Sequence, residues 1–279
     1  MTRIALWVIA GCLSAFVFAG EQTLELEHGL TAAQIVAKNE VARGGQDAWR
    51  KIQTMVWVGH VDSANAPAQN LPFVLALKRP NKTRFELTVL NQMAVRVFDG
   101  KEGWKLRPSG SGGADIRPYT MDELKFARDE QVIDGPLIDY EAKGVSVTLD
   151  GVDQVEGHDA YRLGVRLPSG VNRHVWIDAR TFLDVKVDRQ SRSALGQPVT
   201  VEVMYRNYRN IDGLQIPLMI ESGIATSEKK DKLVIDKISL NPPLEDFMFA
   251  KPTAQGLRNS ASIGVDTSQA TGAMGRPAP

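Results

Sequence analysis

Acidic side chains and a tryptophan crowd one short stretch of the chain, RVFDGKEGWKL at residues 96–106. Asp99 and Glu102 could present carboxylates for catalysis or for a metal, and Trp104 could stack on a sugar or a base. A calcium loop of the EF-hand type needs acids at alternate positions and a glycine at the sixth, which this stretch lacks. Asp-Gly between two apolar runs is instead typical of a β-hairpin, because the turn requires a positive φ. The stretch therefore predicts a hairpin with Trp104 at the start of its return strand.

Histidine offers no recognisable catalytic or metal-binding pattern. Zinc needs three or four convergent ligands, and the sequence contains no H-E-x-x-H pair. Spatial convergence of two distant histidines stays open, and His60 with His174 is the pair to examine. The four histidines are His28, His60, His158 and His174.

Serines and carboxylates also lack a catalytic setting. There is no G-x-S-x-G nucleophile elbow, and the glycine-rich run at 109–113 lacks the lysine of a phosphate-binding loop. Asp178, Asp184 and Asp188 fall in turns or on the polar faces of alternating strands, and nothing marks a carboxyl in a desolvated pocket. We therefore predict a protein that is not an enzyme, with no catalytic residues, no metal and no cofactor.

The N-terminus predicts a signal peptide at residues 1–19. Arg3 precedes an uncharged apolar run at 4–18, and a cleavage site fits after Ala19. The run is shorter than the roughly 20 apolar residues that span a bilayer. Gly11-Cys12 resembles the lipobox of bacterial lipoproteins, so lipidation at Cys12 with membrane anchoring is the weaker alternative, because the sequence stays apolar after Cys12. We expect export to the periplasm.

The charge balance excludes a general affinity for nucleic acid. The chain has 33 basic and 33 acidic side chains, and removal of Arg3 with the leader leaves 32 against 33, a net charge of −1. Nucleic-acid binding proteins carry a basic surface, which a balanced chain does not supply. Cys12 is the only cysteine, so the cleaved chain would contain no disulfide and no thiol chemistry.

Three segments predict helices. Thr31 and Gln34 have the spacing of a capping box, and Gly44-Gly45 ends the helical pattern that follows. A short second helix is predicted over 46–52, and a third over 119–131, after the glycine-rich loop. Beyond residue 252 the chain turns to Gly, Ser, Ala, Thr and Pro, so we predict a disordered tail at 253–279.

Residues 55–240 predict an antiparallel sheet. Short runs alternate apolar and polar residues and are separated by turn signals such as Asp-Gly and Pro-Ser-Gly. Two early strands differ, because 55–58 and 73–77 are apolar at consecutive positions. Both faces of these strands need a cover, or one face needs an apolar ligand. A curved sheet with the predicted helices partly in its concavity satisfies this requirement.

The chain resembles the outer-membrane lipoprotein-sorting proteins, the LolA-LolB-like periplasmic carrier superfamily. The resemblance covers about residues 30–252, and its motifs are weak singly but specific in their order and spacing. The matching stretches are LTAAQIVAKN at 30–39, ARGG at 42–45, IQTM at 52–55, FDG at 98–100 with GW at 103–104, VEGHDAYRL at 155–163, IDARTFL at 177–183, YRNIDG at 208–213 with IP at 216–217, and LNPPLED at 240–246 with Phe249.

The resemblance implies a mainly β fold with helices (α+β), an unclosed antiparallel β half-barrel whose hydrophobic concave face is lidded by helices. Residues 20–252 would form one carrier domain. The implied function is non-enzymatic binding of lipoprotein acyl chains, or of another lipid, in the half-barrel cavity during lipoprotein sorting. We expect a monomer that also meets inner- or outer-membrane proteins of the envelope. Six apolar residues are the candidate cavity residues: Trp57, Phe73, Leu75, Leu77, Phe85 and Leu87.

Two other classes of function stay open on the sequence alone. Related domains sense lipidic signals, so the chain could be a lipid- or peptide-sensing interaction module that signals to a membrane partner. An envelope hydrolase is the third class, and it would depend on residues such as His60, His174 or Asp178.

Overall fold

A computed structural model describes residues 29–64, 66–109, 113–130, 133–193 and 196–253. The predicted signal peptide with Cys12, His28, and the predicted tail from residue 254 onward lie outside these residues. Within the described ranges, no helix combines the length and the apolar character needed to cross a bilayer.

The described residues form one antiparallel sheet of 13 strands, which does not close into a barrel, together with a few helices. Strands β1 to β6 form one meander, β7 to β13 form another, and pairing of β1 with β13 joins the two. The strands are β1 Thr54–Ser63, β2 Leu71–Lys78, β3 Lys82–Val89, β4 Gln92–Phe98, β5 Gly103–Pro108, β6 Ala114–Pro118, β7 Ser146–Val155, β8 His158–Arg166, β9 Asn172–Asp178, β10 Asp184–Arg192, β11 Pro198–Ile211, β12 Leu214–Ile224 and β13 Asp231–Leu240. The predicted mainly β, unclosed fold is confirmed.

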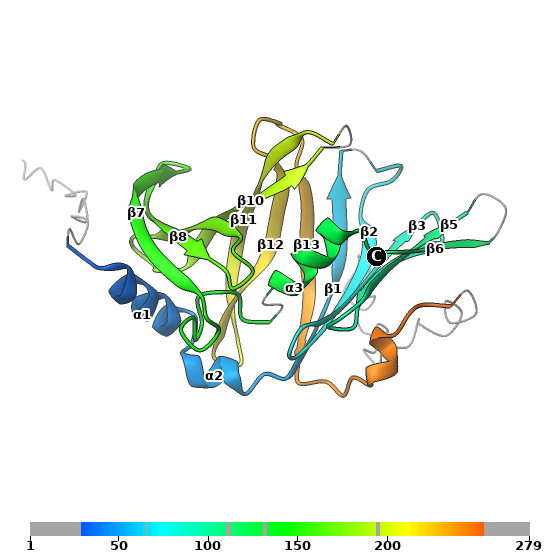
Figure 1. Ribbon diagram of the computed structural model, residues 1–279, viewed down its shortest axis with the longest axis horizontal. Helices are drawn as coiled ribbons and strands as arrows, with labels where there is room; N and C mark the ends of the chain where they lie inside the picture. Colours follow the sequence, from blue (N-terminus) through cyan, green and yellow to red (C-terminus); the bar gives the residue numbers. More distant parts are fainter. Residues whose placement is uncertain (1–28, 65, 110–112, 131–132, 194–195, 254–279) are drawn as a thin grey trace, which may run out of the picture.

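This strand order decides where the third helix lies. Strands β6 and β7 follow each other in sequence but occupy the two opposite edges of the sheet. The chain between them must therefore cross one whole face. Helix α3 (Met121–Asp129) and the turns at 133–145 make this crossing, and Figure 1 shows α3 in front of the central strands. We call the crossed face the inner face and the opposite one the outer face.

The predicted helices are present with shorter bounds. Helix α1 (Ala32–Ala42) begins with the expected capping box between Thr31 and Gln34. Helix α2 is Gln46–Arg50, and α3 has a second capping box, between Thr120 and Glu123. Reciprocal capping satisfies two backbone N–H groups that the first turn leaves without partners. These start signals were readable from the sequence because they depend only on local spacing.

The acidic stretch at 96–106 is a hairpin, as predicted. Phe98 pairs with Gly103, so β4 turns directly into β5. The Asp99 carboxylate accepts the backbone N–H groups of Lys101 at 2.7 Å and of Glu102 at 2.8 Å. Trp104 pairs with Val97 and packs in the apolar cluster on the outer face. The carboxylate at Asp99 therefore holds a turn.

Helices α1 and α2 bury their apolar residues against the inner face. Ile35 and Val36 of α1 pack on strands β8 to β10, and Trp49 of α2 packs between Met55 and the start of β12. The predicted alternation of β8 is confirmed, since all four of its inward residues belong to the core. They are Tyr161, Leu163, Val165 and Leu167, the last just beyond the strand.

The outer face of the early strands has a cover that we did not expect. The sequence required a cover on each face of the doubly apolar strands, or an apolar ligand on one face, and we expected helices partly in the concavity as the cover. The C-terminal segment instead lies on the outer face, where Leu244 and the fully buried Phe249 complete a cluster. Phe249 ends the short 3₁₀ helix η1 (Asp246–Phe249). The other buried members of this cluster are Val56, Ala76, Val95, Val97 and Leu106.

Polar contacts attach the C-terminal segment to β2 and β3. The Asp246 carboxylate lies 2.8 Å from the Lys78 amine and 3.0 Å from the Lys82 amine. Arg84 donates from Nη1 to the Met248 carbonyl at 3.0 Å. With the outer face of the early strands covered in this way, their inner face is left as the place where apolar surface can meet a ligand.

Candidate ligand-binding site

The structure brings all six predicted cavity residues together on the inner face of β1, β2 and β3. Trp57 pairs with Leu75, Leu75 with Phe85, and Phe73 with Leu87. Neighbouring residues of an antiparallel pair lie side by side on one face. The rings of Phe73 and Phe85 stack with centroids 5.7 Å apart. Their role in binding a ligand stays a prediction.

Four of these six side chains are only half-buried. Phe73 and Leu77 are buried, whereas the remaining four keep part of their surface exposed. The same partly exposed apolar surface continues onto the neighbouring strands. It is formed by Trp57, Leu75, Phe85, Leu87, Val89, Leu218, Ile220, Leu233 and Ile238, which we call the inner apolar surface. Contiguous exposed apolar surface of this kind marks an interaction or ligand site.

Strands β1 and β13 approach each other closely at Gly59, next to the inner apolar surface. A β-bulge between Val58 and Gly59 shifts the pairing of β1 with β13. A Cβ at Gly59 would lie 2.0 Å from the Val234 carbonyl oxygen and 2.9 Å from the Phe73 ring. Only glycine fits there, because any larger residue would displace the Phe73 ring and the β13 backbone.

A cavity of about 210 Å³ lies beside this surface, between strands β9 to β12 and the turns at 133–137. Trp57 and Ile220 belong both to its wall and to the inner apolar surface, so the two are continuous. Of the six predicted residues, Trp57 alone is in the wall. The other apolar lining residues are Trp49, Ile133, Pro136, Leu137, Val175, Val187, Ile216 and Pro217.

One side of the cavity is polar and is organised by helix α1. Arg43 lies with Nη1 3.4 Å from Oδ2 of Asp184, and both side chains are largely buried. Asn39 donates to Asp184 at 3.2 Å, and Tyr208 donates to the Asp184 carbonyl at 2.9 Å. Burial raises the pKa of Asp184, although Arg43 and Asn39 oppose the shift.

The predicted position of Asp184 on its strand was wrong. The sequence placed it, with Asp178 and Asp188, in a turn or on the polar face of an alternating strand. A register shift between Asp184 and Lys186 in the pairing of β10 with β9 turns Asp184 inward, opposite Ile177. Because side chains alternate along a strand, one extra residue moves a side chain to the other face. Val185 accordingly packs on the outer face with Trp176.

A second polar group lines the cavity under the end of α3. Arg173 of β9 has a side chain only 8% exposed, and its Nη1 lies 3.8 Å from Oε1 of Glu130. Tyr205 of β11 is in the same wall. Burial raises the pKa of Tyr205, and the neighbouring acids Asp184 and Glu130 add to the shift. The Tyr205 hydroxyl therefore stays protonated and can donate a hydrogen bond.

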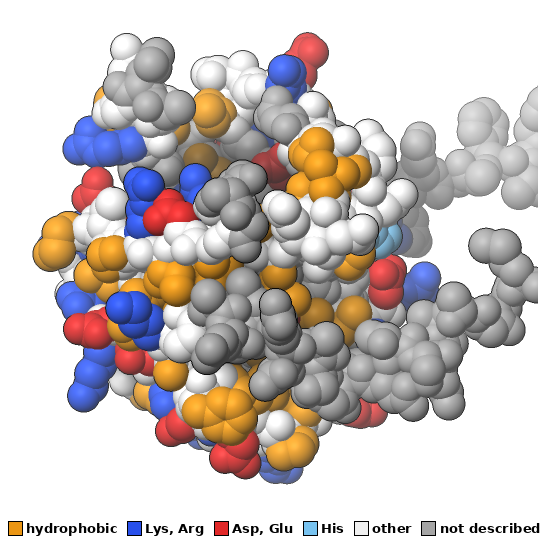
Figure 2. All heavy atoms as spheres, turned by 90° about the vertical axis from the view of Figure 1, so that its right-hand side faces the viewer, with side chains coloured by type: hydrophobic (Ala, Val, Ile, Leu, Met, Phe, Trp, Pro, Cys, Tyr) orange, Lys and Arg blue, Asp and Glu red, His pale blue; other side chains and the backbone are white. Residues whose placement is uncertain are grey.

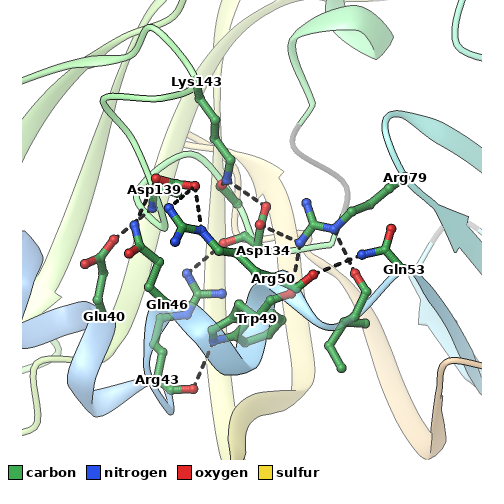
Figure 3. A network of polar contacts seen from close by, with 12 residues as sticks. Glu40, Arg43, Gln46, Trp49, Arg50, Gln53, Arg79, Asp134, Asp139 and Lys143 are labelled. Atoms are coloured by element: carbon green, nitrogen blue, oxygen red, sulfur yellow. Dashed lines mark hydrogen bonds and ion pairs between the residues drawn. The ribbon is translucent and has the colours of Figure 1, made fainter.

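A buried ionic network lies next to the cavity-lining residues Ile133 and Gly135 (Figure 3). The Asp134 carboxylate, 4% exposed, accepts from Arg79 Nη2 at 2.7 Å and from Lys143 Nζ at 2.7 Å. Arg43 donates to the Asp134 carbonyl at 3.0 Å. Burial lowers the pKa of Lys143, and Asp134 opposes the shift.

Asp139 extends the network to helices α2 and α1. Arg50 donates to Asp139 from Nε and from Nη2, at 3.0 and 2.9 Å, and Glu40 accepts the Asp139 backbone N–H at 2.8 Å. Residues 133–145 are thus fastened at several points to the helices and to the end of β2. This fastening holds Ile133 and Leu137 in the cavity wall.

The candidate catalytic groups do not converge in the described part of the chain. His60 lies 3.4 Å from Asp236, whereas His174 lies 2.8 Å from Asp188, so the two histidines have separate partners. Asp178 accepts backbone N–H groups in the turn between β9 and β10. Among the described residues, no three His, Cys, Asp or Glu side chains are grouped to hold a metal.

Solved structures with a similar fold include a LolA superfamily protein and a lipoprotein-sorting domain. A LolA superfamily protein from Nitrosomonas europaea superposes with a TM-score of 0.52 at 17% identity, over 80% of this chain and 98% of that one. A putative outer membrane lipoprotein-sorting protein domain from Vibrio parahaemolyticus gives 0.50 at 13% identity, over 79% and 96%. Models of protein families and curated protein sequences give no match. The chain therefore has a LolA-like fold, as the sequence resemblance indicated.

Sequence reasoning missed the polar wall of the cavity. Arg43 stands in the matched ARGG stretch, but no role was assigned to it. Arg173 shares the inward phase of Val175 and Ile177, so a charge on an apolar face was a readable signal. Asp184 had no such signal, because the bulge that turns it inward is set by pairing with β9.

Proposed function

We propose that this protein is an exported, non-enzymatic carrier that binds the acyl chains of lipoproteins, or of another lipid, on the inner face of its half-barrel in the periplasm. The observation that carries the proposal is the inner apolar surface, which is left partly exposed and is continuous with a cavity. The LolA-like fold supports it. The predicted leader at 1–19 supplies the route of export.

Apolar burial is the driving force that such a site offers. Removing one methylene from water contributes about 0.8 kcal/mol, which tightens binding about fourfold. Binding should therefore strengthen with chain length, until the chain exceeds the length of the surface. The six predicted residues would form part of the contact area, with Trp57 at the entrance to the cavity.

The experiment is analysis of bound lipid in protein purified from periplasm, together with titration of the full chain with the fluorescent probe N-phenyl-1-naphthylamine. We expect co-purified lipid, and loss of probe binding in Leu75→Trp, which fills the inner apolar surface. Val152→Trp, on exposed strand β7, is the matched control and should bind normally. Absence of both bound lipid and probe binding would overturn the proposal.

A further inference from the structure

The wall of the cavity contains buried polar atoms that have no partner. Nε of Arg43, Nε of Arg173 and Nε1 of Trp57 are buried, and no hydrogen-bond acceptor is present for them among the described residues. A buried donor without an acceptor costs free energy. These buried donors would not stabilise a ligand that consists of hydrocarbon alone.

Of the two guanidinium groups, that of Arg173 has fewer polar partners. Its nearest carboxylate oxygen, Oε1 of Glu130, is 3.8 Å from Nη1, which is beyond hydrogen-bond distance. Arg43 differs, since Asp184 and the Asp134 carbonyl both lie near its Nη1. The Arg173 guanidinium can therefore accept a further anionic partner.

Positive charge exceeds negative charge on this part of the inner face. Three guanidinium groups lie near the cavity, those of Arg43, Arg173 and Arg189, against the two carboxylates of Asp184 and Glu130. Arg189 lies over the Phe126 ring, with its Cζ 4.4 Å from the ring centroid. Burial lowers the pKa of Arg189. One added negative charge would balance the set.

We propose that the ligand is a single-chain acidic amphiphile, whose ionised head binds Arg173 and Tyr205 while its chain lies over Trp57 and Ile220 on the inner apolar surface. This inference rests on the proposed lipid-binding function. A guanidinium presents two parallel donors that match a carboxylate or a phosphate, and the Tyr205 hydroxyl adds a third. The cavity of about 210 Å³ is smaller than the usual range of about 300–1,000 Å³ for ligand pockets, which favours one chain.

The test compares ligands of equal chain length and different head on the full chain. Palmitate, hexadecyl phosphate and hexadecanol are titrated by calorimetry. We expect at least tenfold tighter binding of one or both anions than of hexadecanol, and the better anion identifies the head. Inorganic phosphate alone should not compete, because it lacks the chain.

Substitutions then test where the ionised head group of the ligand binds. Arg173→Gln and Tyr205→Phe should each bring anion binding toward that of hexadecanol and should weaken hexadecanol binding far less than anion binding. Arg162→Gln, which removes a guanidinium paired with Asp153 away from the cavity, is the control and should change neither. Equal binding of acids and alcohol by the unaltered protein would overturn the inference and leave the proposed function standing. Failure of all three ligands to bind would overturn both.

Discussion

The guanidinium of Arg79 donates to the carboxylate of Asp134 across 2.7 Å and so joins the end of β2 to the chain that crosses the inner face. Lys143 donates to the other carboxylate oxygen. This crossing chain links the two edges of the sheet. The buried Asp134 carboxylate, with its two cationic partners, is therefore one of the contacts that fix this chain over the inner face.

Replacing Asp134 should strongly destabilise the protein. Asp134→Ala leaves Arg79 and Lys143 buried without their counter-charge, and breaking a buried pair in this way costs about 3–5 kcal/mol. Urea denaturation followed by circular dichroism measures the free energy of unfolding. Asp47→Ala is the control, since Asp47 is 89% exposed and pairs with Arg50 only at the surface; its effect should stay below about 0.5 kcal/mol. Similar midpoints for the two variants would contradict this role of Asp134.

The C-terminal segment should be as important to stability as a core strand. Phe249 is fully buried against the outer face, whereas Phe247, two residues earlier, is 77% exposed. Phe249→Ala should lower the free energy of unfolding by about 3–5 kcal/mol. Phe247→Ala should change it by less than about 0.5 kcal/mol, as is usual for exposed positions. Equal losses in thermal or urea denaturation would show that the segment does not cover the sheet.

Local patterns in the sequence predicted much of this fold. Thr31 and Gln34 marked the start of α1 because a capping box depends on four neighbouring residues, and the Asp99 turn depended on its own loop. Pairing of β1 with β13 joins residues about 180 positions apart, and no local spacing encodes it; the family resemblance supplied the architecture. The cover by Phe249 was missed for the same reason.

The sequence predicted the apolar residues of the candidate site but not the polar ones. The consecutive apolar residues at 73–77 marked β2 as buried on both faces, and pairing with β1 places Phe73, Leu75 and Leu77 together on the inner one. Asp184 was misplaced because a bulge reversed its face. Arg173 was overlooked because a charge within an alternating strand is ordinarily exposed. Pairing between distant strands therefore determines which polar side chains face the cavity.

Asn39 should fasten α1 to the turn that begins β10. Its side-chain amide donates to the Phe182 carbonyl at 2.8 Å and to Asp184 at 3.2 Å, and the residue is fully buried. Asn39→Ala leaves both acceptors short of a donor, at a cost of about 1–3 kcal/mol. In Asn39→Ala, backbone amide hydrogens of α1 and of the chain around residue 183 should exchange faster than in the unaltered protein. Asn172→Ala, at an exposed position of β9, should exchange like the unaltered protein; faster exchange in both variants alike would refute the contact's role.

Glu123 should hold α3 over the inner face in a pH-dependent way. Burial would raise its pKa, but hydrogen bonds from Lys105, the Thr120 backbone and Arg96 outweigh burial and lower the pKa from 4.5 to about 2. The folded pKa lies below the unfolded one, so the stabilisation is fully present above about pH 4.5 and is lost as the pH falls toward 2.

Carbon-13 NMR of the Glu123 carboxyl carbon measures this directly. Its titration midpoint should lie near pH 2 in the unaltered protein, because the Lys105 amine lies 2.8 Å from Oε2. Lys105→Met removes the first of the opposing hydrogen bonds and should move the midpoint upward toward 4.5. Lys125→Met, on the exposed side of α3, keeps that contact and should leave the midpoint in place. A midpoint near 4.5 in the unaltered protein would mean that the Glu123 contacts do not attach α3 to the strands beneath it.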